Sequence, residues 1–273
     1  MPHSDLIEKL SEVIDLVFEG GKNNYIRISK NGKAYWGKWT TKSPCFSKSA
    51  IKQSVQFLIE NCYFTVGNCI LRQSIGIPMG IDPAPFWANL FLYVYESSYM
   101  SSLVQTDRAK ARLFFLIKRF IDDLCAINDE GEFGRVFREI YPPELELKLE
   151  HSGQMATFLN LHIQILNGKF VYKLFDKRDA FPFSIVRMPH RESNIPESIF
   201  YSALAGEFLR ISRSSMLMGD LVSSSKELVV RMKNQGGKDA RISRVLRKVA
   251  VKHSGVFANF ETEMQDLIRT IVE

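Results

Sequence analysis

Residues 114–128 read Phe-Phe-Leu-Ile-Lys-Arg-Phe-Ile-Asp-Asp-Leu-Cys-Ala-Ile-Asn. An apolar run is interrupted by two adjacent carboxylates, Asp122 and Asp123, and then resumes, which predicts a β-hairpin with both acids at its tip. Two neighbouring carboxylates repel each other, so a fold tolerates them beside a hydrophobic core by supplying a divalent cation or by leaving them in water. Taken alone, an Asp-Asp pair is more often a solvated turn than a metal site.

A second informative stretch lies about forty residues upstream and reads Gln73-Ser-Ile-Gly-Ile-Pro-Met-Gly-Ile-Asp-Pro-Ala-Pro-Phe-Trp-Ala-Asn89. It holds three loop-forming residues, Gly76, Pro78 and Gly80. Asp82 and Pro83 follow, which predicts an N-cap with proline at the first helical position and a helix continuing through Glu96. Glycines ahead of a helix start leave backbone N–H groups accessible to a phosphate. The stretch therefore predicts a loop that a nucleotide could approach.

Together, these stretches resemble the palm of reverse transcriptases, most closely the Penelope-like retroelement branch. The first corresponds to the family's aromatic-x-Asp-Asp motif, and the second to its glycine-loop motif. The matching segments follow the family order over about residues 1–215: Gln73–Gly80 with Pro83, Pro85 and Asn89, then Phe120–Asp123, Thr157–Ile163, Lys173–Arg178 and Ser193–Pro196. One departure is Asn160, which stands where that family usually has aspartate.

The resemblance implies template-directed addition of deoxynucleotides to a primer hydroxyl, with Mg²⁺ as cofactor and a primer-template duplex as partner. Asp122 and Asp123 would be the catalytic carboxylates that face the metal, Asp122 more directly. The nucleotide and template side would be formed by Gln73, Gly76, Pro78, Gly80, Asn89 and Phe120. Such enzymes hold two divalent cations with three carboxylates. Residues 1–6 resemble the segment after the strand that carries the third, so we expect the chain to begin just after that strand and not to polymerise alone.

The chain as a whole is expected to be α+β. The resemblance implies a palm-like antiparallel sheet with packed helices over residues 1–194, followed by a helical, basic, thumb-like subdomain over residues 195–273. Apolar periodicity and turn dipeptides predict helices over 4–18, 47–59, 131–140 and from 195 onward, hairpins over 25–36 and 62–72, a strand over 145–150, and a hairpin of 156–165 with 169–175.

A basic segment near the C-terminus is the main charge feature. Residues 226–252 contain nine Lys or Arg and two acids, a net charge of +7, whereas the whole chain carries +6, so the remainder is about neutral. Four cations recur at three- and four-residue steps opposite an apolar stripe; they are Arg241, Arg244, Lys248 and Lys252. With Arg210 and Arg213 on the preceding helix, they are expected to contact a nucleic-acid backbone. A solvated helix is the alternative, and a membrane surface is disfavoured because the apolar side lacks Trp or Phe.

Composition sets the remaining limits. At 273 residues with 45% hydrophobic and 24% charged residues, the chain is an ordinary globular sequence. It shows neither a membrane-length apolar run nor a signal-peptide layout, so we expect an intracellular protein, nuclear or cytoplasmic. The four cysteines form no Cys-x-x-Cys pair, which favours reduced, mostly buried thiols; they are Cys45, Cys62, Cys69 and Cys125.

Two functions from different classes remain open at this point. The first is a reverse transcriptase domain fragment that carries out two-metal nucleotidyl transfer. The alternative is a non-catalytic nucleic-acid-binding remnant of a retroelement protein, in which the palm is only a scaffold. Binding that weakens with salt but ignores Mg²⁺ would favour the second. A structural protein without a nucleic-acid role would require the order of the motifs to be coincidental.

Overall fold

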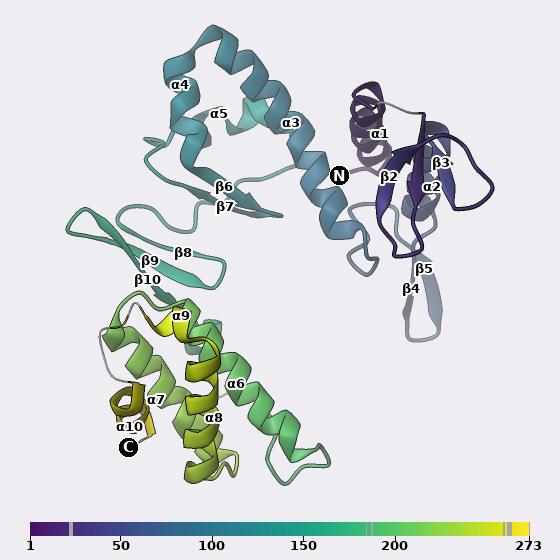
Figure 1. Cartoon of the computed structure of the whole chain (residues 1–273). Coiled ribbons are helices and arrows are strands. Elements are labelled where there is room, and N and C mark those ends of the chain that lie inside the picture. Colours follow the sequence, from purple (N-terminus) through teal and green to yellow (C-terminus); the bar gives the residue numbers. More distant parts are fainter. Residues whose placement is uncertain (22–23, 184, 187, 259, 261–263, 273) are drawn as a thin grey trace. The chain divides into compact units, whose positions relative to one another are not determined.

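The computed structural model describes residues 1–21, 24–183, 185–186, 188–258, 260 and 264–272. Contacts between residues divide the chain into two compact units, 1–148 and 149–273 (Figure 1). Helices and small antiparallel sheets occur in both, which confirms the predicted α+β class. The strands form several small sheets of two or three strands rather than one continuous sheet. The expected change from palm to thumb at residue 195 falls inside the second unit.

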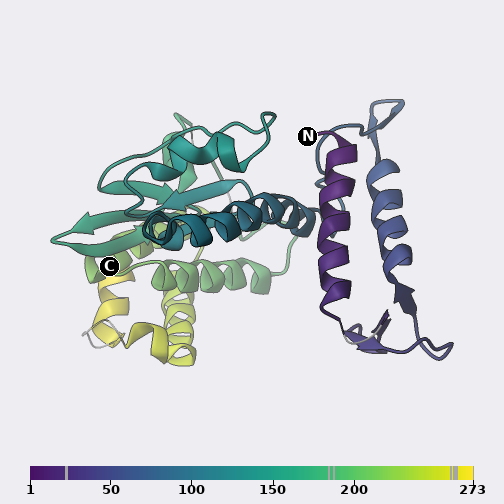
Figure 2. The same cartoon turned by 90° about the horizontal axis from the view of Figure 1, so that it is seen from above.

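Unit 1 begins with two helices that pack side by side, and a three-stranded sheet in the order β2-β1-β3 lies at one end of the pair (Figure 2). These elements are α1 (His3–Glu19), β1 (Tyr25–Ile28), β2 (Ala34–Gly37), β3 (Cys45–Ser47) and α2 (Lys48–Glu60). Gly32, at φ 75°, occupies the predicted Asn-Gly turn between β1 and β2. The Ser47 hydroxyl accepts a hydrogen bond from the Ala50 amide and caps α2. The helices and the first hairpin thus form as the sequence predicts.

The next segment is a hairpin followed by a long helix: β4 (Tyr63–Val66), β5 (Cys69–Arg72) and α3 (Ala84–Thr106). One local prediction is wrong, because the N-cap of α3 is Pro83 and Asp82 does not cap the helix with its side chain. Proline at the cap offers no acceptor side chain, and the turn is closed instead by the Ala84 amide, which donates to the Ile81 carbonyl. The core around α3 is built from Leu6, Leu10, Ile59, Trp87 and Phe91.

The end of unit 1 contains α4 (Arg108–Leu113), η1 (Phe114–Leu116), β6 (Ile117–Phe120), β7 (Asp123–Ala126) and α5 (Glu132–Ile140). The predicted hairpin with both acids at its tip is confirmed, although Phe114–Leu116 form a 3-10 turn rather than strand. The four apolar positions predicted to face inward on α5 are all buried: Phe133, Val136, Phe137 and Ile140. With Tyr141 they form the core beneath the hairpin.

Unit 2 consists of a three-stranded meander and a helical bundle. Its elements are β8 (Met155–Phe158), β9 (Leu161–Leu166), β10 (Lys169–Leu174), η2 (Lys177–Ala180), α6 (Glu197–Arg213), α7 (Met218–Asn234), α8 (Asp239–Lys252), α9 (Ser254–Phe257) and α10 (Met264–Val272). The stripe predicted on α6 is buried in the bundle core: Phe200, Leu204, Phe208 and Ile211. The burial of these large apolar side chains stabilises the packing of the helices, because it removes their surface from water.

Two strand predictions in this part of the chain are wrong. Residues 145–150 form no strand, and Leu149 is 78% exposed, because the alternating sequence has no neighbouring strand to pair with. Residues 156–165 form two strands instead of one, since the chain reverses at Leu159-Asn160. The predicted pairing across Asn167-Gly168 is confirmed.

Two further expectations concern the burial of the cysteines and the presence of a membrane-spanning helix. All four cysteines are free, but none is buried: three are half-buried and Cys69 is exposed, so the predicted burial is wrong. Among the described residues, no helix has both the length and the apolar character needed to cross a membrane.

Candidate functional site: the Asp-Asp hairpin and a basic helix

The β6–β7 hairpin presents its two carboxylates at a tight, strained turn. Phe120 pairs with Asp123, so Ile121 and Asp122 are the two central turn residues. Ile121 has φ 55°, and a positive φ at only the first central residue is typical of a type II′ turn, where glycine normally stands. A β-branched residue in this conformation costs about 1–3 kcal/mol, and such strain concentrates at functional sites.

The two faces of the hairpin have different chemistry. Residues paired across the strands share a face, so Phe120 and Asp123 lie together on the exposed side. On the opposite side, Ile117 and Leu124 pack against the core of α5. Asp122 and Asp123 are both exposed, and within the described part of the chain neither carboxylate has a hydrogen bond or an ion pair. The hairpin therefore turns two unpaired carboxylates and one aromatic ring toward solvent.

Arg119 fixes the hairpin to helix α3. Its Nε and Nη2 donate to the two carboxylate oxygens of Glu96 at 2.5 and 3.0 Å. Its Nη1 donates to the Asn89 side-chain oxygen at 2.8 Å and to the carbonyl oxygen of Ile121 at 3.2 Å. The bidentate pair is directional and charge-assisted. One guanidinium thus connects the helix directly to the strained turn.

Glu96 has a second donor in Tyr141, whose hydroxyl lies 2.5 Å from the same carboxylate. Burial, together with this hydrogen bond, raises the pKa of Tyr141 well above its ordinary value. Tyr141 is 5% exposed and belongs to the core of α5. Hydrogen bonds among Arg119, Glu96 and Tyr141 therefore connect α3, the hairpin and the end of α5.

The glycine loop is held against the start of α1. The Gly76 amide donates to the Met1 carbonyl at 2.9 Å, and the His3 ring nitrogen lies 3.1 Å from the Gly76 carbonyl oxygen. Gln73 is turned inward on its own loop, since its side-chain amide donates to the Ile75 carbonyl. Pro78 is buried, whereas Gly80 is exposed. These contacts give the loop a defined conformation.

Of the six residues predicted for the nucleotide and template side, the structure brings two to the acidic hairpin. Phe120 lies on the hairpin itself, and Asn89 reaches it through Arg119. Among the described residues, no hydrogen bond joins the other four to Asp122 or Asp123; these are Gln73, Gly76, Pro78 and Gly80. Sequence reasoning missed Arg119, Glu96 and Tyr141. The available signal was an arginine at an inward position of an apolar strand, because such a guanidinium needs hydrogen-bond acceptors nearby.

The Asp122–Asp123 pair has the donor chemistry that Mg²⁺ requires. Carboxylate oxygens suit this hard cation, which usually keeps several waters and takes only one or two protein carboxylates together with substrate phosphates. Among the described residues, no cluster of three or more His, Cys, Asp or Glu could hold a metal ion. The pair thus fits Mg²⁺ as a partial ligand set.

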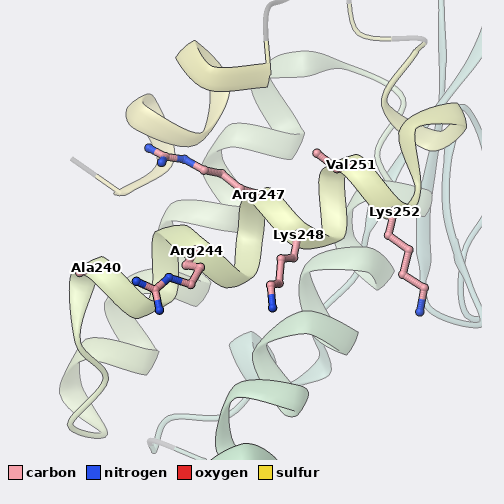
Figure 3. A pocket seen from close by; sticks show the side chains of 6 residues that line it. All are labelled: Ala240, Arg244, Arg247, Lys248, Val251 and Lys252. Carbon is pink, nitrogen blue, oxygen red and sulfur yellow. The ribbon is translucent and has the colours of Figure 1, made fainter.

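Helix α8 carries the predicted basic face in unit 2. Ile242, Leu246 and Val249 are buried, and the cations lie on the other side. Figure 3 shows Arg244, Lys248 and Lys252 pointing to one side of the helix, along a shallow hollow of about 490 Å³. In the described part of the chain these three have no ion-pair partner. Consecutive members are four residues, or about 6 Å, apart along the helix. Arg244, Lys248 and Lys252 together form the basic ridge of α8.

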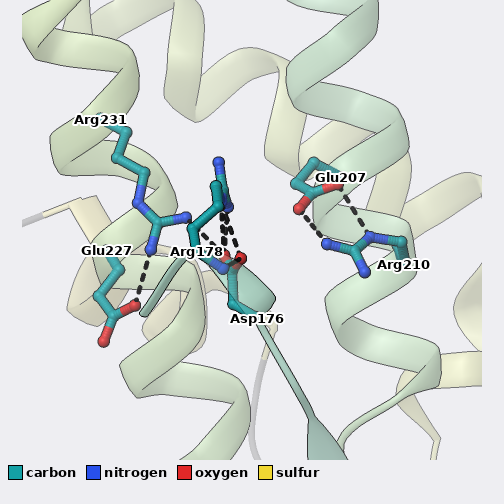
Figure 4. A network of polar contacts seen from close by, with 6 residues as sticks. All are labelled: Asp176, Arg178, Glu207, Arg210, Glu227 and Arg231. Carbon is teal, nitrogen blue, oxygen red and sulfur yellow. Dashed lines mark hydrogen bonds and ion pairs between the residues drawn. The ribbon is translucent and has the colours of Figure 1, made fainter. Parts of the chain in front are cut away.

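The other predicted backbone-binding cations are placed differently. Arg241 pairs with Glu197 at 2.5 Å and stacks over the Tyr201 ring. Arg210 donates to both carboxylate oxygens of Glu207 (Figure 4). Arg213 is exposed at the end of α6.

A polar network occupies a different part of unit 2. Asp176 accepts hydrogen bonds from Arg178 and from Arg231, the latter at 3.1 Å, and Arg231 also reaches Glu227 (Figure 4). The hydrogen bonds from Arg178, with those from Arg231, hold the pKa of the Asp176 carboxyl far below its ordinary value. This network ties η2 to α7 and therefore stabilises the bundle.

Comparisons with protein-family models, with curated proteins and with solved structures give no match for this chain.

Proposed function

We propose that this chain is a reverse transcriptase domain of the Penelope-like type, in which the Asp-Asp hairpin provides metal-binding carboxylates for nucleotidyl transfer. The observation that supports this proposal best is the hairpin tip itself. Two adjacent carboxylates, which have no partner among the described residues, stand on a strained turn that Arg119 and Glu96 hold in place. A solvated turn needs neither the strain nor the supporting network, whereas a metal site benefits from both.

The residues would divide the work as follows. Asp122 and Asp123 would hold Mg²⁺, which on binding neutralises phosphate charge and activates the attacking hydroxyl. The Phe120 ring lies beside Asp123 on the exposed face, where a base or sugar of the primer end can stack on it. Arg119 would position the turn through the Ile121 carbonyl without touching the substrate.

The basic ridge on α8 would contact the duplex backbone. Its three cations, which have no ion-pair partner in the described part of the chain, predict a slope of log K against log salt of about −2.7, from about −0.9 for each phosphate contact on a B-form duplex. Replacing all three with glutamine should therefore remove most of the salt dependence. Arg241→Gln is the matched control, because Arg241 is already paired with Glu197 and should contribute little to the slope.

The test is the Mg²⁺ dependence of the complex with primer-template and a matching deoxynucleoside triphosphate. Because the described residues supply only a pair of carboxylates, binding is a more direct readout than turnover. Nucleotide affinity should rise with Mg²⁺ in the wild-type chain and lose that response in Asp122→Asn and Asp123→Asn. Asp107→Asn, which changes an exposed cap residue on α4, is the charge-matched control.

A non-catalytic nucleic-acid-binding protein is the second candidate, favoured by the basic ridge. In that case duplex binding would fall with salt as above, but Mg²⁺, the nucleotide and the hairpin substitutions would leave it unchanged.

A further inference from the structure

A second basic surface lies in unit 1, and the net charge of the whole chain does not reveal it, because acidic residues elsewhere offset its positive charge. Residues 20–59 contain eight Lys or Arg and no Asp or Glu, a net charge of +8. The near-neutral charge of the chain outside 226–252 arises because acids elsewhere balance this segment. The described residues of this segment form the β2-β1-β3 sheet, the connections between its strands and most of α2.

The two faces of this sheet are unequal. Ile26, Trp36 and Phe46 pair across the strands on one face, and Trp36 packs edge-on against Phe18 of α1 at 5.0 Å. The other face carries Arg27 opposite Tyr35, with the guanidinium 5.3 Å from the ring centroid. The first face is therefore part of the packing on α1, and the second is available for contact.

Four exposed lysines lie in the connections at the ends of these strands: Lys30, Lys33, Lys38 and Lys42. The first two lie at the β1–β2 turn and the other two follow β2, so cations stand at both ends of the strands. None of the four has an ion-pair partner within the described residues. By contrast, Lys48 and Lys52 on α2 of the same segment both form ion pairs with Asp15. The charges of these two lysines are therefore neutralised within the protein, whereas the charges of the four loop lysines are not neutralised by any described residue.

Exposed aromatic rings stand among these lysines. Tyr35 on β2 is 43% exposed, and Trp39, two residues after β2, is 63% exposed. Large aromatic side chains are costly to leave in water, and their interleaving with unpaired cations is typical of surfaces that bind single-stranded nucleic acid. Bases stack on the rings while the cations contact the phosphates, which explains both residue types at once. A duplex offers no free base faces to such rings.

We propose that the Arg27–Tyr35 face of this sheet, with Trp39 and the four lysines, binds single-stranded RNA or DNA. The surface lies at the C-terminal end of α1, whereas the glycine loop contacts the N-terminal end of that helix (Figure 2). These ends are about 25 Å apart along a helix of this length. The surface is thus separate from the glycine loop, and its test does not depend on polymerase activity.

The experiment titrates the full chain with an unstructured octanucleotide, as RNA in one arm and as DNA in another, and follows tryptophan fluorescence. Of the three tryptophans, Trp87 is 5% exposed and Trp36 packs on Phe18, whereas Trp39 is largely exposed. A base that stacks on Trp39 should therefore change the fluorescence of this residue. We expect quenching that saturates, is absent in Trp39→Phe, and weakens with salt with a slope of about −2.8 for four contacts on a single strand. A response in only one arm identifies which nucleic acid the surface takes.

Two variants with matched controls complete the test. Lys38→Gln/Lys42→Gln should weaken binding about 25-fold at 0.1 M salt, whereas Lys169→Gln/Lys177→Gln, which removes the same charge from unit 2, should have a much smaller effect. Trp39→Ala should cost roughly tenfold, and Phe57→Ala, whose side chain is 64% exposed, should cost little.

Any of three results would overturn the proposal. The first is a saturated complex in which tryptophan fluorescence is unchanged, and the second is an equal loss of affinity in the lysine variant and its control. The third is tighter binding to vesicles of anionic phospholipid than to either oligonucleotide, with the same quenching of Trp39, which would assign the surface to membranes.

Discussion

The connection between Glu96 and Arg119 gives the most quantitative prediction about the hairpin. Arg119→Met removes the guanidinium and leaves Glu96 with Tyr141 as its donor. Breaking a buried ion pair costs about 3–5 kcal/mol, but the two side chains here are 15% and 28% exposed, so about 2–3 kcal/mol is expected. Glu96→Gln keeps an acceptor for Tyr141 and should cost about 1–2 kcal/mol. Once one partner has been replaced, replacing the other should destabilise the protein little further, which predicts a coupling energy between Arg119 and Glu96 of about 1–2 kcal/mol.

Native-state amide hydrogen exchange is the assay, because the chain has two units and global unfolding need not be two-state. The opening free energy is read from the amides of residues 117–126. Lys118→Met is the control, since Lys118 lies on the exposed face of the same strand and should change protection by less than about 0.5 kcal/mol. Additive costs in the double variant would refute the reasoning, as would an unchanged protection of the hairpin in Arg119→Met.

Three further predictions concern other parts of the molecule. The pKa of Asp176 is depressed in the folded state, so its stabilisation of unit 2 is complete above the unfolded pKa of about 3.9 and is lost as pH falls below that value. In urea titrations at pH 2 to 6, Asp176→Asn should therefore reduce the loss of stability at acid pH. An unchanged loss of stability would contradict the assignment. Cys69 is exposed whereas burial raises the pKa of Cys125, so mass spectrometry should find Cys69 alkylated first at pH 7.5, and equal rates would contradict this order. A Cβ on Gly237 would lie 2.7 Å from the backbone oxygen of Met232, so the alanine variant should lower the stability of unit 2 by about 1–3 kcal/mol in thermal unfolding, while Gly219→Ala, with open space, should be neutral or stabilising.

Local sequence patterns predicted the individual elements well where a single periodicity decided the outcome. The stripe on α5 and the Asn-Gly turns at Gly32 and Gly168 are such cases. The predictions failed where tertiary partners decide. Residues 145–150 alternate like a strand but have no strand to pair with, and the reversal at Leu159-Asn160 puts a leucine at φ 56°, which turn propensities do not favour.

The candidate site shows the same division between local and tertiary information. The Asp-Asp turn could be located from the sequence, because a pair of carboxylates inside an apolar run is conspicuous. Arg119 could have been noticed as an inward-facing arginine of an apolar strand. Its partners Glu96 and Tyr141 could not be identified, since they lie far away in the chain and meet Arg119 only when α3, the hairpin and α5 pack together. Charge balance also concealed the basic sheet in unit 1, because a net count does not show where the acids are absent.

The central claim is that the exposed carboxylates of the hairpin serve a metal-dependent nucleotide site. The most direct test is the affinity of the chain, bound to a primer-template duplex, for the matching deoxynucleoside triphosphate with and without Mg²⁺. We predict an affinity that rises with Mg²⁺ in the wild-type chain and in Asp107→Asn, and that loses this dependence in Asp122→Asn and Asp123→Asn. An affinity that is the same in all four proteins, with or without Mg²⁺, would contradict the account.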